Sequence, residues 1–192
     1  MSQTQGEIIL VTGGARSGKS VFAERYAAAH GKRIAYIATA QIFDEEMRYR
    51  VALHRKRRPS VWQTYEAPFT AEQAIGQAAA ASDTILFDCV TIYLSNLLCS
   101  LEERQLEDEA LVYAKAEEAV GRLIIAVREA GVRCIFVTNE VGAGIVPEHR
   151  LSRLYRDVAG RANQQLAQAA KAVYLTVAGI PVDVKKLSEA QQ

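Results

Sequence analysis

The chain has 192 residues, 49% of them hydrophobic and 23% charged, so it can bury one substantial core but is short for two full domains. Lysine and arginine number 23 against 22 aspartates and glutamates, and a net charge of +1 gives no global field for attracting nucleic acid or an acidic membrane. Three widely spaced cysteines fit neither a disulfide framework nor a paired zinc site, and the polar start lacks the basic residues of a signal peptide. We therefore expect a single domain over residues 1–192, a cytoplasmic location, no nucleic-acid partner and no membrane span.

The first half of the chain predicts strands that alternate with helices. A short apolar run at 8–11 is typical of a buried parallel strand, and glycines follow it directly. The segment 44–56 begins with acidic residues and ends with basic ones before Pro59, the charge order that a helix dipole favours. In chain order we expect a strand at 8–11, a helix at 20–30 capped by Gly31, a strand at 34–37, a helix at 44–56, a short strand at 62–65 and a helix at 71–81.

The second half continues the alternation and defines the fold class. Short strands separated by helices predict an α/β fold with an open, mostly parallel central sheet flanked by helices on both sides. Ligands of such sheets bind beyond the carboxyl ends of the strands, so the segments after 8–11, 84–87 and 134–137 should converge. We expect a strand at 84–87 ending on Asp88, a helix at 90–101, a long amphipathic helix at 106–130 closed by Gly131, a strand at 134–137, a helix at 150–170 and a strand at 172–177.

The stretch between the first strand and the first helix has the pattern of a P-loop, or Walker A motif, Gly-x4-Gly-Lys-Ser. Its glycines allow a ring of backbone N–H groups, Lys19 reaches the terminal phosphates, and the Ser20 hydroxyl ligates Mg²⁺. The alternative is a glycine-rich turn with a chance lysine. We expect the loop to bind nucleotide through Gly13, Gly14, Ala15, Arg16, Ser17, Gly18, Lys19 and Ser20.

Asp88 follows an apolar strand, which is the placement of a Walker B acid that holds magnesium opposite the P-loop serine. Many buried strands instead end in an acid that caps the next helix. With the P-loop upstream, we expect Ser20 and Asp88 to hold Mg²⁺ together.

His54 lies beside a run of cations, which would depress the imidazole pKa and keep the ring neutral and nucleophilic. By pattern alone, a partly exposed helix histidine without a chemical role remains open. The neighbouring cations could form a solvated face, a nucleic-acid patch or a phosphate clamp, and the near-zero net charge favours the clamp. They are Arg55, Lys56, Arg57 and Arg58.

The glycine-rich segment 139–147 follows a strand, so its backbone could approach a ligand closely, or it could be a structural connector. The next helix carries several arginines, including Arg150, Arg153, Arg156 and Arg161. Surface ion pairing at three- and four-residue spacing explains them simply, whereas an arginine supplied to a phosphate, even one bound by a neighbouring subunit, is the sharper possibility.

Together these residues resemble a known family, the bifunctional adenosylcobinamide kinase and adenosylcobinamide-phosphate guanylyltransferase of cobalamin biosynthesis. The resemblance covers nearly the whole chain and is far more specific than a P-loop alone. The segments that carry it are 11–20, 36–40, 50–59, 137–147 and 156–164.

The resemblance implies two reactions: phosphorylation of adenosylcobinamide by ATP or GTP, then transfer of GMP from GTP to that phosphate, giving adenosyl-GDP-cobinamide and pyrophosphate. It implies a GMP-histidine intermediate at the matching position, His54, and splitting the transfer into two displacements is the purpose of covalent catalysis. It also implies a RecA-like P-loop NTPase fold and a homotrimer. Nucleotide contacts are implied for Ala38, Thr39, Ala40, Arg55, Lys56, Arg57, Arg58, Glu66 and Asp88.

Three alternatives follow from the residues alone. A plain small-molecule P-loop kinase would leave no covalent nucleotide on the protein. A nucleotide-dependent switch would use the glycine-rich loop to signal bound triphosphate to a partner. A nucleic-acid motor has the right sheet but would need a basic excess that this chain lacks.

Overall fold

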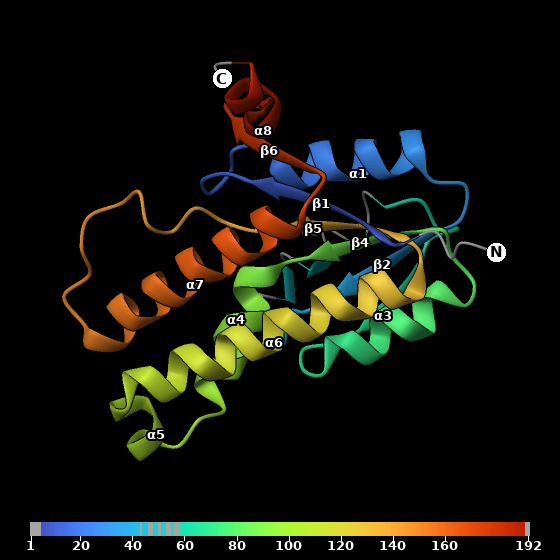
Figure 1. Ribbon diagram of the computed structural model, residues 1–192. Helices are drawn as coiled ribbons and strands as arrows, with labels where there is room; N and C mark the ends of the chain where they lie inside the picture. Colours follow the sequence, from blue (N-terminus) through green and yellow to red (C-terminus); the bar gives the residue numbers. More distant parts are fainter. Residues whose placement is uncertain are drawn as a thin grey trace.

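The computed structural model describes residues 5–42, 44–45, 48–49, 51–52, 55 and 58–190. Strands and helices alternate along most of the chain (Figure 1). The strands are β1 (Glu7–Thr12), β2 (Ile34–Ala38), β3 (Gln63–Glu66), β4 (Thr84–Asp88), β5 (Arg133–Val137), β6 (Ala172–Val177) and β7 (Ile180–Asp183). The helices are α1 (Lys19–His30), α3 (Ala71–Ala79), α4 (Val90–Cys99), α5 (Glu103–Glu107), α6 (Glu109–Ala130), α7 (Arg150–Ala169) and α8 (Val184–Glu189).

The seven strands form one sheet in the order β3-β2-β4-β5-β1-β6-β7. Every neighbouring pair is parallel except β6 and β7, which are antiparallel. Strand β5 separates β1, which leads into the P-loop, from β4, which ends on Asp88. The predicted α/β P-loop fold with a mostly parallel, RecA-like sheet is confirmed.

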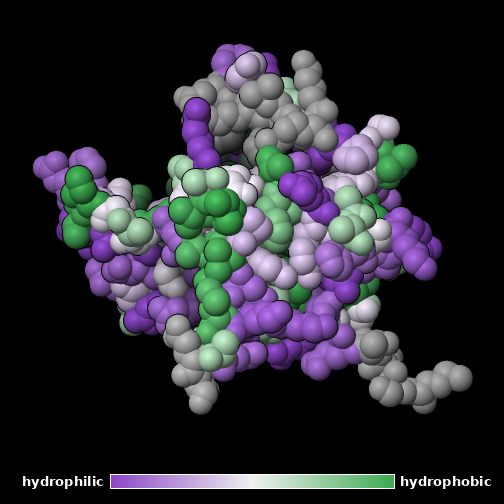
Figure 2. Space-filling view, turned by 90° about the horizontal axis from the view of Figure 1, so that it is seen from above, coloured by the Kyte–Doolittle hydropathy of each residue, from purple (hydrophilic) through white to green (hydrophobic). Residues whose placement is uncertain are grey.

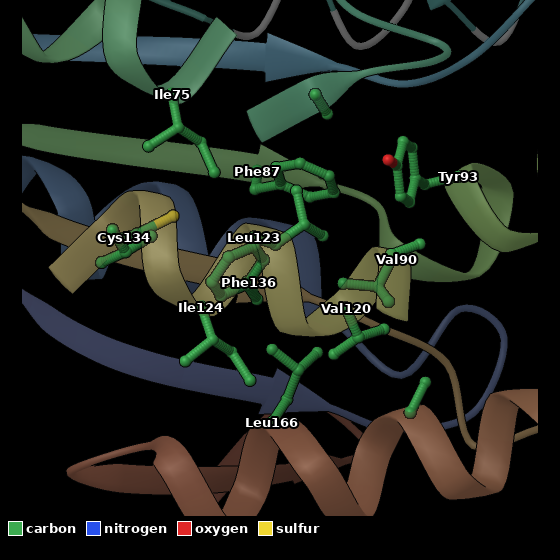
Figure 3. Packing of buried hydrophobic residues seen from close by; sticks show 14 of the residues in the cluster. Ile75, Phe87, Val90, Tyr93, Val120, Leu123, Ile124, Cys134, Phe136 and Leu166 are labelled. Carbon is green, nitrogen blue, oxygen red and sulfur yellow. The ribbon is translucent and has the colours of Figure 1, made fainter. Parts of the chain in front are cut away.

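Helices cover both faces of the sheet because alternate residues of each buried strand point to opposite sides. On one face α1 packs through Ala23 and Ala27 against apolar side chains of β1, β2, β4 and β5. On the other face α3, α4, α6 and α7 enclose the larger core (Figure 1). Phe87 and Phe136 lie at its centre, with ring centroids 5.0 Å apart, under Leu123 of α6 (Figure 3).

The register of the sheet brings the expected segments to one edge. Val11 of β1 pairs with Val137 of β5, and Val137 pairs in turn with Asp88 of β4. Asp88 also pairs with Ala38, the last residue of β2. Because these strands are parallel and end level with one another, the P-loop, Asp88 and the start of the 139–147 segment all leave the sheet at its carboxyl edge.

Some details differ from the sequence expectations. The helix expected at 106–130 is broken at Asp108, whose side chain accepts a hydrogen bond from Leu111 N at 3.0 Å and so begins a new helix, α6. The chain also continues beyond β6 into the unexpected elements β7 and α8.

Gly31 ends α1 as expected, but with an extended backbone, φ −108°, instead of a left-handed cap. A Cβ there would lie 2.7 Å from Thr84 Oγ1, so close packing explains this glycine. In the helix expected at 44–56, the described residues 45, 48, 49, 51, 52 and 55 are helical, and the other positions lie outside the described residues or, at 44, in a bend.

The face seen in Figure 2 carries many hydrophilic side chains, with separate groups of apolar side chains among them. Exposed large apolar residues include Val21, Ile42, Ile145 and Ile180. Within the described ranges, none of the helices combines the length and apolar composition that crossing a membrane requires.

Candidate nucleotide site

The P-loop turns sharply between β1 and α1. Gly18 adopts φ +93°, and a Cβ at this position would lie 3.0 Å from Gly179 Cα, so both conformation and space favour glycine. Arg16 also has positive φ, 58°, and Ser17 N donates to Gly14 O at 3.2 Å. These turns leave the loop in front of the amino end of α1, where backbone N–H groups lack helical partners and favour anions.

Lys19 is 8% exposed and donates from Nζ to Gly14 O at 3.1 Å. Burial lowers the pKa of this ammonium group, although the nearby Cys89 and Asp88 act in the opposite direction. The lysine is therefore held against the P-loop, where it is expected to contact nucleotide phosphates.

A cleft of about 980 Å³ opens beside the loop at the carboxyl edge of the sheet. Many of the residues expected to bind nucleotide line it, together with apolar residues such as Ile42, Val51 and Ile92. The expected residues on its wall are Ala15, Arg16, Gly18, Lys19, Ser20, Ala38, Ala40, Arg55, Arg58, Glu66 and Asp88, and Asn139 joins them.

The remaining expected residues divide into two groups. Gly13, Gly14, Ser17 and Thr39 lie in or beside the loop and β2 but do not line the cleft. His54, Lys56 and Arg57 lie outside the described residues, although Arg55, the residue after His54, is on the cleft wall.

Asp88 shares the cleft wall with Tyr36 and Arg58. Tyr36 Oη donates to Asp88 Oδ2 at 3.0 Å, and the Arg58 guanidinium carbon lies 3.6 Å from the centre of the Tyr36 ring. Burial raises the pKa of Tyr36, and the negative charge of Asp88 raises it further, so the phenol keeps its proton. The peptide bond between Asp88 and Cys89 is cis.

The described cations of the basic segment are tied to β3. Arg55 Nη2 forms an ion pair with Glu66 Oε1, and Arg58 Nη1 donates to Thr64 Oγ1 at 3.3 Å. Both contacts reach β3, an edge strand of the sheet. Glu66, named from the family resemblance alone, therefore contacts the basic segment directly.

Buried polar groups brace the ends of β2 and β4. Thr39 Oγ1 donates to Cys89 O and accepts from Cys89 N, both at 2.9 Å. Asn96 of α4, 6% exposed, donates from Nδ2 to Thr39 O at 2.8 Å and to Pro68 O at 3.1 Å. Sequence reasoning missed Asn96, for which the only signal was an amide within a mainly apolar helix.

The segment after β5 is tied back to the P-loop strand. Asn139 Nδ2 donates to Thr91 Oγ1 at 2.7 Å, and Asn163 Nδ2 of α7 donates to Asn139 O at 3.2 Å. Glu140 Oε1 accepts from both Asn163 Nδ2 and Thr12 Oγ1. The glycines that follow are exposed and do not line the cleft, to which this segment contributes only Asn139.

The arginines of α7 contact other elements instead of pairing along their own helix. Arg150 donates to the carbonyls of Leu106 and Glu107, Arg153 to that of Glu148, and Arg161 pairs with Glu117. Ion pairing and carbonyl capping thus explain these three. Arg156 differs: its Nη1 is buried with no hydrogen-bond partner among the described residues.

The cleft offers oxygen donors suited to magnesium. Ser20 and Asp88 are both on its wall, and a hydroxyl with one carboxylate is a donor set that Mg²⁺ accepts when water and phosphate oxygens complete the octahedron. In the described part of the chain, no cluster of three or more His, Cys, Asp or Glu side chains forms an all-protein metal cage. This donor set fits an ion that arrives with its nucleotide.

The parallel sheet, the P-loop with its buried lysine and the acid at the end of β4 define a P-loop nucleotide-binding protein. The family model described as cobinamide kinase / cobinamide phosphate guanyltransferase matches residues 9–184. The chain belongs to this family, and it is an enzyme of cobalamin biosynthesis with kinase and guanylyltransferase activity. The resemblance noted from the sequence is confirmed.

Relatives support the same assignment over almost the full chain. The bifunctional adenosylcobalamin biosynthesis proteins CobU of Salmonella typhimurium and of Escherichia coli are each 44% identical over 182 residues, covering 93% of this chain and 99% of theirs. CobP of Pseudomonas aeruginosa, which bears the same description, is 43% identical over 176 residues, covering 92% of this chain and 96% of its own. Among solved structures, a KaiC-like protein from Pyrococcus horikoshii is 16% identical, with a TM-score of 0.48 over 89% of this chain and 71% of that one.

Proposed function

We propose that the cleft carries out two successive transfers: a phosphoryl group from ATP or GTP to adenosylcobinamide, then GMP from GTP to the resulting phosphate. The observation that supports this most directly is the single cleft on which the P-loop, Asp88, the described cations and Glu66 meet. A catalyst of phosphoryl transfer works mainly by positioning and charge stabilisation, and this wall supplies both.

In the kinase step, the loop amides and Lys19 hold the transferred phosphoryl group. Lys19 exchanges its bond to Gly14 O for phosphate oxygens, which are stronger partners for an ammonium group. Magnesium, held by Ser20 and Asp88, would offset the charge of the phosphates. Ala38 and Ala40 then line the nucleotide beside the end of β2, and the buried Thr39 between them holds this segment in place through its bonds to Cys89.

In the guanylyl step, His54 attacks the α-phosphorus of GTP. A nitrogen–phosphorus bond forms as the bond from that phosphorus to the bridging oxygen breaks, and pyrophosphate leaves with the electron pair. A phosphate oxygen of the cobinamide phosphate then attacks the same phosphorus and returns the electron pair to the imidazole. Arg55, Lys56, Arg57 and Arg58 offset the negative charge, and Glu66 positions Arg55 through their ion pair.

We also propose that the chain acts in the cytoplasm as one domain within a homotrimer. These remain predictions from the sequence and its family resemblance. Light scattering on the purified protein would report the mass of the assembly against the 21.1 kDa chain.

The test of the covalent mechanism is retention of label. Protein incubated with magnesium and GTP labelled in the α-phosphate should keep acid-labile, alkali-stable label after precipitation, whereas γ-labelled GTP should leave none. His54→Ala should bind GTP but retain no α-label. Well-folded, GTP-binding wild-type protein without α-label would remove the GMP-histidine and leave a plain kinase or a nucleotide switch.

A further inference from the structure

Tyr36 touches two groups that the proposed function assigns to different tasks. Its hydroxyl donates to Asp88 Oδ2 at 3.0 Å, and its ring lies under the Arg58 guanidinium, 3.6 Å from the guanidinium carbon. The side chain lines the cleft.

The sheet fixes where Tyr36 points. In the β2–β4 register Tyr36 pairs with Leu86, and Ala38 pairs with Asp88, so all four lie on one face. Tyr36 is only 3% exposed and belongs to the core cluster under α1. A ring anchored in the core has little rotational freedom. Its hydroxyl and its face therefore hold Asp88 and Arg58 in defined positions.

The two contacts differ in kind and are separable. The hydroxyl restrains one carboxylate oxygen of Asp88 and so orients the other oxygen. The ring attracts the planar guanidinium of Arg58 through its negative face. The second contact fixes Arg58 at the end of the basic segment, where Arg58 also donates to Thr64.

We infer that Tyr36 is a positioning residue, whose hydroxyl orients Asp88 toward nucleotide-bound magnesium and whose ring seats Arg58 against the phosphates. The inference rests on the proposed function for the roles of Asp88 and Arg58. Tyr36 itself forms no bond to a reacting atom. It links the acid of the kinase step to the basic segment of the guanylyl step.

Two substitutions separate the two contacts. Tyr36→Phe removes the hydroxyl and keeps the ring, so Asp88 loses this hydrogen bond while Arg58 keeps its contact with the ring. Arg58→Lys keeps the charge but loses the planar group that lies on the ring. Tyr36→Leu removes both contacts.

Tyr93→Phe is the matched control. Tyr93 is also a buried tyrosine whose hydroxyl points to a carboxylate, Glu72 Oε2 at 3.5 Å, but it lies beside Phe87 in the core and not on the cleft wall (Figure 3). We expect this substitution to leave nucleotide binding unchanged.

The measurement is the dissociation constant of GTP, by calorimetry, in excess magnesium and in EDTA, with the wild-type reference and every variant carrying His54→Ala so that no GMP-histidine forms. For Tyr36→Phe we expect the gain in affinity from magnesium to shrink by about tenfold, with the EDTA value within about twofold of wild type. For Arg58→Lys we expect about fivefold weaker binding in EDTA with the magnesium gain retained. Tyr36→Leu should show both the smaller gain from magnesium and the weaker GTP binding in EDTA. Adding Arg58→Lys to Tyr36→Leu should weaken GTP binding in EDTA no further.

Each result decides one half of the inference. An unchanged magnesium gain in Tyr36→Phe would overturn the role of the hydroxyl, and wild-type EDTA binding by Arg58→Lys, or losses that add in the double variant, would overturn the role of the ring. If Tyr36→Leu fails to fold, the two milder variants still decide. Because binding is measured without turnover, a wild-type protein that binds GTP but modifies no corrinoid would refute the proposed function separately.

Discussion

Glu7 ties the start of β1 to its neighbours at the sheet edge opposite the cleft. Arg133 Nε of β5 donates to Glu7 Oε2 at 2.6 Å, and Lys171 Nζ lies 2.5 Å from Glu7 Oε1. Burial raises the pKa of this carboxyl group, but the bonds to Lys171 and Arg133 outweigh burial and hold the pKa below its ordinary value of 4.5. The folded state therefore stabilises the ionised form.

The substitution Glu7→Gln keeps the shape of the side chain and removes its charge. The Glu7 side chain is 21% exposed and that of Lys171 is 74% exposed, so one bond is sheltered and the other is largely screened. A hydrogen bond to a charged group contributes about 1.5–3 kcal/mol and an exposed pair about 0–1 kcal/mol, so we expect a total loss of about 2 kcal/mol at pH 7. For a chain of this size the melting temperature should fall by about 4–8 °C.

The effect should depend on pH in a defined direction. Because the folded pKa lies below the unfolded one, the stabilisation is fully present above the unfolded pKa and is lost as the pH falls through the folded pKa. Thermal unfolding of wild type and Glu7→Gln from neutral to acid pH measures this. Glu118→Gln, at an exposed pair with Arg122 within α6, is the control and should cost at most about 0.5 kcal/mol. Equal melting temperatures at pH 7, or a difference that does not shrink in acid, would refute the reasoning.

Three further outcomes are expected. In native protein the exposed Cys99 should react rapidly with a thiol reagent. Burial raises the pKa of Cys89 to about 11 and that of Cys134 well above its usual range, so these two thiols should react only on unfolding, and three rapidly reacting thiols would contradict this. Gly18→Ala should lower stability by about 1–3 kcal/mol in thermal unfolding and weaken GTP binding at least tenfold in calorimetry, because φ is +93° there. Leu123→Ala should cost about 3–5 kcal/mol in urea unfolding because its fully buried side chain packs in the centre of the core, and a loss below about 1 kcal/mol would contradict that packing.

Much of the sheet could be predicted because parallel strands buried on both faces read as short continuous apolar runs. β1, β4 and β5 show this pattern plainly, and the polar residue after each run marks the carboxyl edge. The P-loop adds a pattern of glycines whose backbone demands are strict. Convergence of the P-loop, Asp88 and Asn139 then follows from topology alone.

The hairpin of β6 and β7 was missed for a physical reason. Its turn places Ala178 at φ +50° before Gly179 at φ +84°, and alanine is an uncommon choice for a left-handed conformation. Pro181 also argues against a strand, yet β7 is an edge strand, where proline is tolerated. Tertiary context overrode the local pattern.

Some residues of the site could be predicted from the sequence and others could not. Lys19 and Asp88 belong to recognisable sequence motifs. Tyr36, in contrast, looks like an ordinary aromatic residue of a buried strand, and Asn96 looks like an isolated amide in a helix. Their roles come from contacts with β4, Pro68 and Thr39, which no local pattern encodes. Such bracing residues become visible only once the strands are placed side by side.

In the proposed function, one cleft built on the P-loop serves both transfers. We would supply adenosylcobinamide, or adenosylcobinamide phosphate, with GTP and magnesium to wild-type protein and to Lys19→Ala, and follow the corrinoid by mass spectrometry. We expect wild type to add a phosphoryl group and then GMP with release of pyrophosphate, and Lys19→Ala to fail with both substrates. A folded Lys19→Ala protein that guanylylates the supplied phosphate at the wild-type rate, or a wild type that binds GTP and leaves both corrinoids unchanged, would contradict the claim.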